Sequence, residues 1–349
     1  MILRGRRGID RSGAGQRWLR PVVLSLFVAF LGACAPELAE PGPARIEPSL
    51  LADQLVTSDG TALPLRAWLP EGPVEAVVLA LHGFNDYSNA FAESGHRWAD
   101  LGIATYAYDQ RGFGNTPNRG LWPDIATLTD DLRTAARLVH NRHPQAPIYL
   151  LGESMGGAVA MVAMTGANPP DVDGIILSAP AVWARSTMPV YQRVALWIAA
   201  YTIPWAKLSG RGLEIQASDN IEMLMALGRD PLIIGETRVD AIYGLVDLMD
   251  QALAAAPRLD VPALLLYGEK DEIVPLEATL QLWRGLPAAA AGEQRIALYA
   301  DGWHMLLRDL QAQVVIADIA AWIADPAAPL PSGADDRALA AILATEETS

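Results

Sequence analysis

A serine flanked by glycines carries the most specific chemical signal in this sequence. Residues 148–158 read IYLLGESMGGA, an apolar run followed by Gly152-Glu153-Ser154-Met155-Gly156 and then by small residues suited to a helix. A G-x-S-x-G pattern between a strand and a helix is typical of a nucleophile elbow, a sharp turn that leaves no room for bulky neighbours of the serine. The pattern therefore predicts that Ser154 stands exposed at a helix N-terminus as a nucleophile.

Two downstream segments offer the partners that a serine hydroxyl needs, which are a base to take its proton and an anion to orient that base. The apolar run at 263–268 leads into a loop with Asp271, and the run at 295–300 leads into a loop with His304. Taken singly, each residue has a structural interpretation as well, because a loop aspartate is often a turn former. The chain order Ser154, Asp271, His304 resembles that of α/β-hydrolases and differs from the chymotrypsin and subtilisin orders.

The loop after the apolar run at 76–81 is expected to complete this machinery. It reads His82-Gly83-Phe84, and a second donor is expected at Met155, directly after the serine. Acyl transfer builds negative charge on the former carbonyl oxygen, and fixed backbone N–H groups stabilise it. We therefore predict that the N–H groups of Phe84 and Met155 form the oxyanion hole, while His82 orders its loop through hydrogen bonds.

Three further charged residues lie near these segments. Asp109 and Arg111 follow the strand predicted at 102–108, where they could bind substrate, although stabilisation of the loop is the favoured interpretation. Glu153 is a second acid close to the serine. Its place inside the elbow suits a buried hydrogen bond better than the orientation of His304.

Together these motifs resemble the α/β-hydrolase superfamily, and within it the monoacylglycerol lipase and lysophospholipase-like branch, also called the serine aminopeptidase-like group. The matching segments are 82–84, 109–114, 152–157, 268–275 and 302–304. The resemblance implies a mostly parallel central sheet with helices on both faces and a helical cap. It also implies a serine hydrolase that cleaves carboxylic esters of lipid-like substrates, monoacylglycerol or lysophospholipid, through an acyl-enzyme and without a cofactor.

Other functions on the same fold stay open at this point. Acyltransferases, cofactor-free haloperoxidases and carbon–carbon bond hydrolases share the triad, and water exclusion by the cap would decide between hydrolysis and acyl transfer. Epoxide hydrolases and haloalkane dehalogenases of this fold use an aspartate nucleophile, so Ser154 argues against them. A binding protein without activity would be expected to have lost a triad residue, and none is missing.

The N-terminal residues indicate where the protein is located. Six arginines precede the apolar segment 21–33, which is too short to span a bilayer comfortably, since a spanning helix needs about 20 residues. Residues 1–33 therefore resemble a signal peptide that ends in a lipobox before Cys34, the only cysteine in the chain. We expect lipidation at Cys34, with an uncleaved anchor or a buried thiol as alternatives. Residues 34–49 are rich in proline and are expected to form a tether that does not pack. Ala35 after the cysteine suggests the outer membrane, on the periplasmic or surface side.

Composition fits an exported globular enzyme. The formal net charge is −14, and it becomes about −19 once the segment with six arginines and one aspartate is removed. This acidity disfavours nucleic acids as partners. The sequence shows no metal-ligand cluster, P-loop or complete dinucleotide-binding motif, so neither a metal nor a cofactor is expected.

Alternating strand and helix patterns define one α/β domain over 50–325. We expect an antiparallel hairpin at 53–70, and the remaining strands at 76–82, 102–108, 147–152, 174–179, 263–268 and 295–300. Helices are expected at 88–100, 125–142, 155–166, 236–254, 276–285 and 307–324. A cap at about 181–235 should place Val194, Trp197, Ile198 and Tyr201 as a lid over the strand ends, offering an apolar surface to an acyl chain. The tail 326–349, with a short helix at 335–345, is expected to be peripheral.

Overall fold

The structure, a computed structural model, describes residues 35–210, 212, 214–287 and 293–346. The predicted signal peptide at 1–33 and the predicted lipidation site Cys34 lie outside the described residues. Within the described ranges, no helix combines the length and the apolar character needed to cross a membrane.

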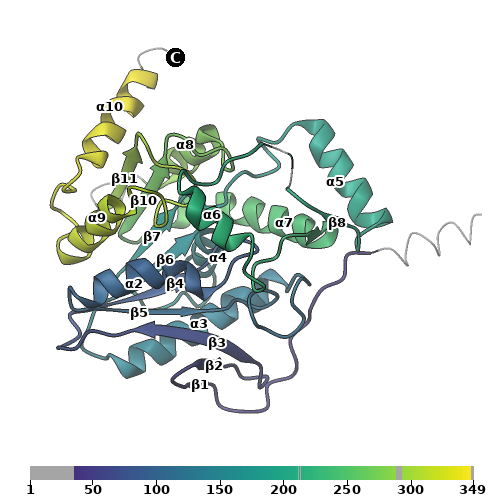
Figure 1. Ribbon diagram of the computed structural model, residues 1–349, viewed down its shortest axis with the longest axis horizontal. Helices are drawn as coiled ribbons and strands as arrows, with labels where there is room; N and C mark the ends of the chain where they lie inside the picture. Colours follow the sequence, from purple (N-terminus) through teal and green to yellow (C-terminus); the bar gives the residue numbers. More distant parts are fainter. Residues whose placement is uncertain (1–34, 211, 213, 288–292, 347–349) are drawn as a thin grey trace, which may run out of the picture.

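A central sheet of nine strands organises the described part of the chain, in the order β1-β2-β3-β5-β4-β6-β7-β10-β11 (Figure 1). Strands β4 to β7, β10 and β11 pair in parallel, and β1 to β3 form an antiparallel edge. The strands are β1 (Ser49–Leu50), β2 (Gln54–Val56), β3 (Ala62–Trp68), β4 (Ala76–Leu81), β5 (Ile103–Tyr108), β6 (Ile148–Glu153), β7 (Gly174–Ser178), β10 (Ala263–Gly268) and β11 (Gln294–Tyr299). The predicted hairpin and the six predicted parallel strands are confirmed.

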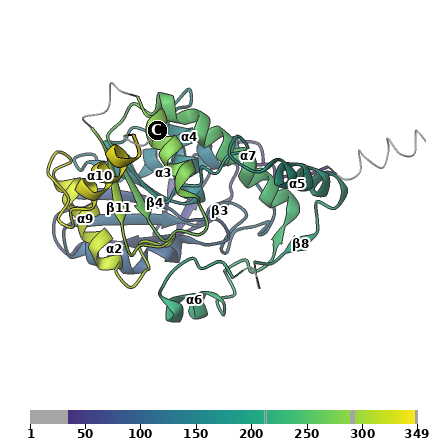
Figure 2. The ribbon, with the colours of Figure 1, turned by 90° about the horizontal axis from the view of Figure 1, so that it is seen from above.

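Helices cover both faces of the sheet, as Figure 2 shows. Those on one face are α3 (Ile125–Arg142), α4 (Met155–Met164), α7 (Val239–Ala255) and α8 (Leu276–Gly285), and those on the other are α2 (Ala92–Ala99) and α9 (Ala312–Ala324). Two short 3-10 turns, Ser88–Phe91 and Ala256–Arg258, adjoin α2 and α7. This is the expected α/β-hydrolase arrangement.

Alternation along the strands explains the two layers. In β4, Val77 and Leu79 pack with α3 and α4, whereas Val78 and Ala80 pack with α2 and α9. Successive side chains of a strand point to opposite faces, and a strand that is buried on both faces has a continuous apolar sequence. The apolar runs in the sequence therefore mark the strands whose ends carry the site.

The start of α9 differs from the prediction. The helix begins at Ala312, not at residue 307, because the residues before it are held in a loop. The side chains of Arg308 and Asp309 bind groups from distant segments, and the Leu310 N–H donates to the Asp219 carboxylate at 2.9 Å. These tertiary bonds replace the first turn of the predicted helix.

The C-terminal tail contributes to the packing. Helix α10 (Ala334–Glu346) lies beside β11, the last strand of the sheet. Leu330, Ala334 and Ala338 are buried, and Asp335 accepts from Arg295 of β11 at 2.8 Å. The segment that we expected to be peripheral thus covers one edge of the domain.

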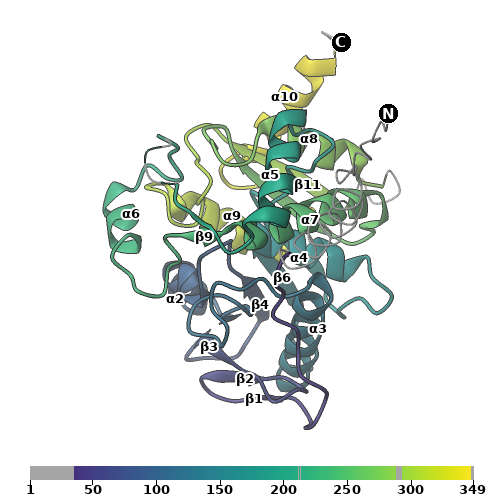
Figure 3. The same cartoon turned by 90° about the vertical axis from the view of Figure 1, so that its right-hand side faces the viewer.

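The insertion after β7 contains α5 (Val190–Thr202), β8 (Lys207–Leu208) and α6 (Ile221–Leu227), and it ends at β9 (Thr237–Arg238), which pairs antiparallel with β8. Figure 3 shows α5 and α6 well apart from each other. Of the residues expected to form the lid, Val194, Trp197 and Ile198 are each about half exposed, so these side chains are not packed against the domain. Contact with α7 uses other residues of α5, among which Ala200 is buried.

Residues 35–39, which we call the strap, contact the domain. Leu38 forms a parallel bridge with Trp122, and the Ala39 N–H donates to the Trp122 carbonyl at 2.8 Å. Glu37 forms an ion pair with Arg238 of β9 at 2.9 Å. The proline-rich segment was expected not to pack, but its first residues are fixed by these long-range contacts.

Candidate active site

The turn between β6 and α4 has the strained geometry of a nucleophile elbow. Ser154 has φ 51° and ψ −113°, in a region that residues with a Cβ rarely adopt. Its N–H donates to the Ser178 carbonyl at 2.9 Å, and its own carbonyl accepts from the Ala181 N–H at 2.9 Å. These bonds to the strand end of β7 and the residues after it hold the strained conformation, and Ser154 stays partly exposed.

Close backbone contacts explain the glycines of this motif. A Cβ added at Gly156 would lie 2.1 Å from the Leu81 carbonyl oxygen, and one at Gly152 would lie 2.4 Å from the Gly157 Cα. Neither backbone neighbour can move without distorting β4 or α4. The G-x-S-x-G pattern is therefore required by the packing of the turn against its own helix and the neighbouring strand.

Asp271 and His304 are brought together from the loops after β10 and β11. The distance from His304 Nδ1 to Asp271 Oδ2 is 2.8 Å, and both side chains are almost fully buried. Asp271 Oδ1 also accepts from the N–H groups of Ile273 and Val274 at 2.7 and 3.0 Å. Asp271 thus forms a turn and orients a histidine at once. With Nδ1 bound to the carboxylate, Nε2 is the ring nitrogen left for proton transfer.

The loop after β4 lies against the elbow. A Cβ added at Gly83 would lie 3.5 Å from the Ser154 Cβ, so the backbone passes directly beside the serine. Within the described residues, the N–H groups of Phe84 and Met155 donate to no other group of the chain. Both predicted oxyanion donors are therefore uncommitted, and Met155 begins α4, where helix N–H groups lack helical acceptors.

His82 orders this loop, as the sequence suggested. Its Nε2 accepts from the Gln110 N–H at 2.9 Å, so its Nδ1 carries the proton and donates to the Gly83 carbonyl at 2.8 Å. Complete burial lowers the pKa of His82 and keeps the ring neutral. The Gln110 side chain returns a hydrogen bond to the His82 carbonyl at 2.8 Å.

Ser154 and His304 share no hydrogen bond within the described part of the chain. Their segments are joined instead by Arg308, four residues after the histidine, which donates to Glu153 Oε1 at 2.6 Å. Arg308 also contacts Asp86 Oδ2 at 2.7 Å, in the loop after β4 that carries the predicted oxyanion donor Phe84 and is called the oxyanion loop below. One guanidinium therefore connects the elbow, the oxyanion loop and the histidine loop.

This cluster of Asp86, Glu153 and Arg308 is buried, each residue being less than a tenth exposed. Burial alone would lower the pKa of Arg308, but the nearby Asp86 and Glu153 carboxylates outweigh this effect, and the pKa is raised above its ordinary value. Glu153 is thereby committed to Arg308, in agreement with the interpretation that it does not orient His304. Arg308 and Asp86 are not among the site residues predicted from the sequence; for Arg308, the available signal was the charged pair Arg308-Asp309 inside the otherwise apolar run at 305–310.

Asp309 connects the histidine loop to the cap. Its carboxylate accepts from the Ser218 hydroxyl at 2.6 Å and from the Trp303 N–H at 2.7 Å. Burial raises the pKa of Asp309 to about 6, although both hydrogen bonds act in the opposite direction. The Met305 N–H also donates to the Ala217 carbonyl at 3.1 Å. Other atoms of residues 216–220 form hydrogen bonds with the loop that carries Asp271 and with the loop that carries His304.

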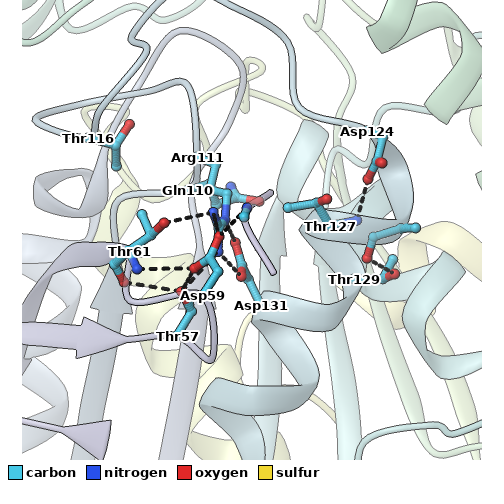
Figure 4. Close-up of polar contacts among 12 residues, drawn as sticks. Thr57, Asp59, Thr61, Gln110, Arg111, Thr116, Asp124, Thr127, Thr129 and Asp131 are labelled. Atoms are coloured by element: carbon cyan, nitrogen blue, oxygen red, sulfur yellow. Dashed lines mark hydrogen bonds and ion pairs between the residues drawn. The ribbon is translucent and has the colours of Figure 1, made fainter. Parts of the chain in front are cut away.

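Arg111 and Asp109 have structural roles. Figure 4 shows the Arg111 guanidinium between Asp59 of the hairpin turn and Asp131 of α3, at 2.8 and 2.6 Å. Asp109 is fully buried, and it accepts from the Ser88 N–H at 3.0 Å and the Asn115 N–H at 2.9 Å. Both residues stabilise the loop after β5, the interpretation that the sequence favoured. No group of three or more His, Cys, Asp or Glu side chains suited to a metal ion occurs in the described ranges.

The class that this fold and these residues define is the α/β-hydrolase class of carboxylic ester hydrolases. A family model described as serine aminopeptidase, S33, matches residues 72–311, and the chain belongs to this family. The match includes every motif segment from the oxyanion loop to the histidine loop.

Relatives of known name support this class. The chain is 27% identical over 272 residues to a monoacylglycerol lipase of Mycolicibacterium smegmatis, in an alignment that covers 76% of this chain and 93% of the lipase. It is likewise 27% identical over 278 residues to the monoglyceride lipase of Rattus norvegicus, covering 77% of this chain and 89% of that one.

Solved structures show the same fold. A soluble variant of monoglyceride lipase from Saccharomyces cerevisiae, in complex with a substrate analog, superposes with a TM-score of 0.65 at 21% identity, covering 81% of this chain and 98% of that one. The monoacylglycerol lipase of Paleococcus ferrophilus superposes with a TM-score of 0.62 at 20% identity, covering 75% and 98%.

Proposed function

We propose that the protein hydrolyses carboxylic esters of lipid-like substrates, with monoacylglycerol or lysophospholipid as the leading class, through Ser154, His304 and Asp271. The observation that carries this proposal is the 2.8 Å contact between His304 Nδ1 and the buried Asp271 carboxylate, formed by loops at the same sheet edge as the strained Ser154 turn. Active groups of α/β sheets gather at the carboxyl ends of the strands.

Acylation is the first half of the proposed reaction. His304 Nε2 takes the proton of the Ser154 hydroxyl as its oxygen attacks the ester carbonyl, and Asp271 stabilises the imidazolium that results. The negative oxygen of the tetrahedral intermediate accepts from the N–H groups of Phe84 and Met155. His304 then protonates the leaving alcohol, and the acyl group remains on Ser154.

Deacylation repeats these steps with water. His304 removes a proton from a water molecule, whose oxygen attacks the acyl-enzyme carbonyl, and the same two N–H groups stabilise the second tetrahedral intermediate. Collapse of this intermediate breaks the bond to Ser154, which recovers its proton from His304. The products are a carboxylic acid and the free enzyme.

The apolar composition of the cap is one reason to propose a substrate with a lipid-like acyl group. The stretch from Val190 to Met225 is rich in aromatic and aliphatic side chains, which suit an alkyl chain better than a charged acyl group. The named relatives are lipases of monoacylglycerols, which agrees with this choice. Transfer of the acyl group to an alcohol would use the same acyl-enzyme.

Substitution of the serine tests the proposal. Ser154→Ala is expected to abolish hydrolysis of a p-nitrophenyl ester and labelling by a fluorophosphonate, with an unchanged circular dichroism spectrum. Ser58→Ala, at an exposed turn, is the matched control and should keep full activity. A panel of acyl chains and head groups then identifies the substrate. Turnover of Ser154→Ala at the parent rate would refute the assignment.

We also propose that the protein is exported and anchored to a membrane, in the outer membrane, by lipidation of Cys34. The support is the arginine-rich start of the sequence, its short apolar segment and the lipobox-like Leu31-Gly32-Ala33-Cys34. Cys34→Ala is expected to release the protein from the membrane fraction and to leave its N-terminus without lipid in mass spectrometry. Unchanged fractionation together with an unmodified N-terminus in the parent would contradict this proposal.

A further inference from the structure

The predicted oxyanion donor Phe84 lies in a tight turn formed by residues 83–86. The Asp86 N–H donates to the Gly83 carbonyl at 3.3 Å, which closes the turn. Asn85, the third residue of the turn, has φ 65°. A type II turn requires a positive φ at this position, where glycine and asparagine are preferred. The conformation of the turn that contains Phe84 therefore depends on how Asn85 is held.

The peptide unit that supplies the Phe84 N–H is fixed through its carbonyl. This carbonyl, of Gly83, accepts from His82 Nδ1 at 2.8 Å as well as from the Asp86 N–H. A trans peptide unit is planar, and its N–H and C=O point in opposite directions. The two bonds to the carbonyl therefore also set the direction of the Phe84 N–H, which donates to no other group in the described part of the chain.

The end of the insertion binds the same turn from outside. We call residues 230–237 the return segment. The Asn85 side-chain amide donates to Thr237 Oγ1 at 2.7 Å, and the Asn85 carbonyl accepts from the Ile234 N–H at 3.0 Å. Two residues after Asn85, the Tyr87 hydroxyl donates to the Asp230 carboxylate at 2.7 Å. Three hydrogen bonds thus join the return segment to the oxyanion loop, and two of them act on the residue with positive φ.

We propose that Asn85 and Thr237 are positioning residues for the oxyanion hole, and that the return segment holds the turn of Phe84 in the form that catalysis needs. This inference rests on the proposed function, since it assumes that an oxyanion forms at the carbonyl attacked by Ser154. Residues 216–220 of the same insertion are bound to the loop of His304. The insertion therefore supports both places where charge develops, the negative oxygen and the imidazolium.

Replacement of Thr237 tests the contact. Thr237→Val removes the hydroxyl acceptor and keeps the branched shape. Because the oxyanion donor acts on the transition state, kcat for a soluble p-nitrophenyl ester should fall by about tenfold or more, with KM changed by less than about twofold. Thr237→Ser retains the hydroxyl and should keep most of the parent kcat. The control Thr202→Val, the same substitution at an exposed site of α5, should leave kcat unchanged.

A double substitution tests whether the two side chains act as one unit. Asn85→Gly removes the side-chain amide and leaves a residue that adopts positive φ readily. If the contact between these side chains carries the effect, adding Thr237→Val to Asn85→Gly should cause no further loss of kcat. Losses that multiply in the double variant would overturn the proposal that Thr237 acts through Asn85.

An inhibitor that forms an oxyanion separates positioning from stability. The ketone carbon of an alkyl trifluoromethyl ketone bonds to the Ser154 oxygen, its carbonyl oxygen becomes negative, and the serine proton passes to His304. The inhibition constant of this ketone should rise in Thr237→Val by the factor by which kcat falls. The ether analogue of the ester, with CH₂ in place of the carbonyl, should keep its inhibition constant. Partial unfolding would lower the measured kcat but would change neither constant.

The outcomes distinguish this inference from the proposed function. Parent-like kcat in Thr237→Val, or a reduced kcat with unchanged binding of the trifluoromethyl ketone, would overturn the role of the return segment. Activity of Ser154→Ala at the parent rate would instead refute the proposed function. If Ser154→Ala is inactive while Thr237→Val is normal, the hydrolase assignment stands and the positioning role alone is rejected.

Discussion

Replacement of Arg308 by methionine is expected to destabilise the protein and impair turnover together. Its guanidinium lies 2.7 Å from the Asp86 carboxylate and 2.6 Å from that of Glu153, and all three side chains are buried. Methionine preserves much of the volume but leaves two carboxylates without a cation. Removal of one partner from a buried ion pair costs about 3–5 kcal/mol, a large share of the roughly 5–15 kcal/mol of a typical protein.

Urea denaturation followed by circular dichroism measures this cost directly. A loss of that size also lowers the melting temperature by on the order of 10 °C. Addition of Glu153→Gln and Asp86→Asn to the methionine variant removes the unpaired charges and should recover at least about 2 kcal/mol. The control is Arg284→Met, an exposed arginine 3.7 Å from Glu277, which should cost less than about 1 kcal/mol.

The same variant should lower kcat, because Arg308 joins the elbow to the oxyanion loop. Arg308→Lys is expected to lie between the parent and Arg308→Met, since a point charge cannot hold two carboxylates as a planar guanidinium does. A free energy of unfolding for Arg308→Met within about 1 kcal/mol of the parent, with normal kcat, would refute the view that this cluster organises the site.

The other predictions concern single carboxylates. Asp271→Asn should reduce kcat by about 10³- to 10⁴-fold with the fold intact, because the amide cannot stabilise the His304 imidazolium; near-normal ester hydrolysis would transfer this role to another acid. For Asp309, whose folded pKa of about 6 exceeds its ordinary value, the stabilising contribution is present at low pH and is lost as the pH rises from roughly 4 to 6. Asp309→Asn lacks this loss, so its stability relative to the parent should increase by about 2 kcal/mol between pH 4 and 7 in urea titrations. If the difference in stability between Asp309→Asn and the parent stays constant with pH, the raised pKa of Asp309 would be contradicted.

The strands and most helices were predictable because local patterns decide them. Strands buried on both faces need continuous apolar sequence, as in β4 and β10, and α3 and α8 have the bounds that their patterns indicated. The elbow was predictable for a different reason: its glycines are required by contacts within ten residues of Ser154 and with the adjacent strand. The loop positions of Asp271 and His304 follow from the strands that precede them.

Features set by long-range contacts were not predictable. The delayed start of α9 depends on partners of Arg308 more than 150 residues earlier in the chain, which no local pattern contains. The strap is held to the domain by a backbone bridge between Leu38 and Trp122, and its own sequence offers no periodicity to indicate this. In α5 the helical apolar repeat was recognised, but a repeat does not show whether core, substrate or solvent lies opposite.

The bonds between residues 216–220 and the loops of Asp271 and His304 limit how this enzyme can open. The Gln216 N–H donates to Glu272 at 2.7 Å and the Ser218 hydroxyl donates to Asp309 at 2.6 Å, so an outward movement of that half of the insertion would have to break bonds to the loops that carry Asp271 and His304. Among the described residues, α5 makes no hydrogen bond to either of these loops, so a displacement of α5 would leave their contacts in place. The two halves of this one insertion therefore differ: residues 216–220 are fastened to the loops of Asp271 and His304, and α5 is not.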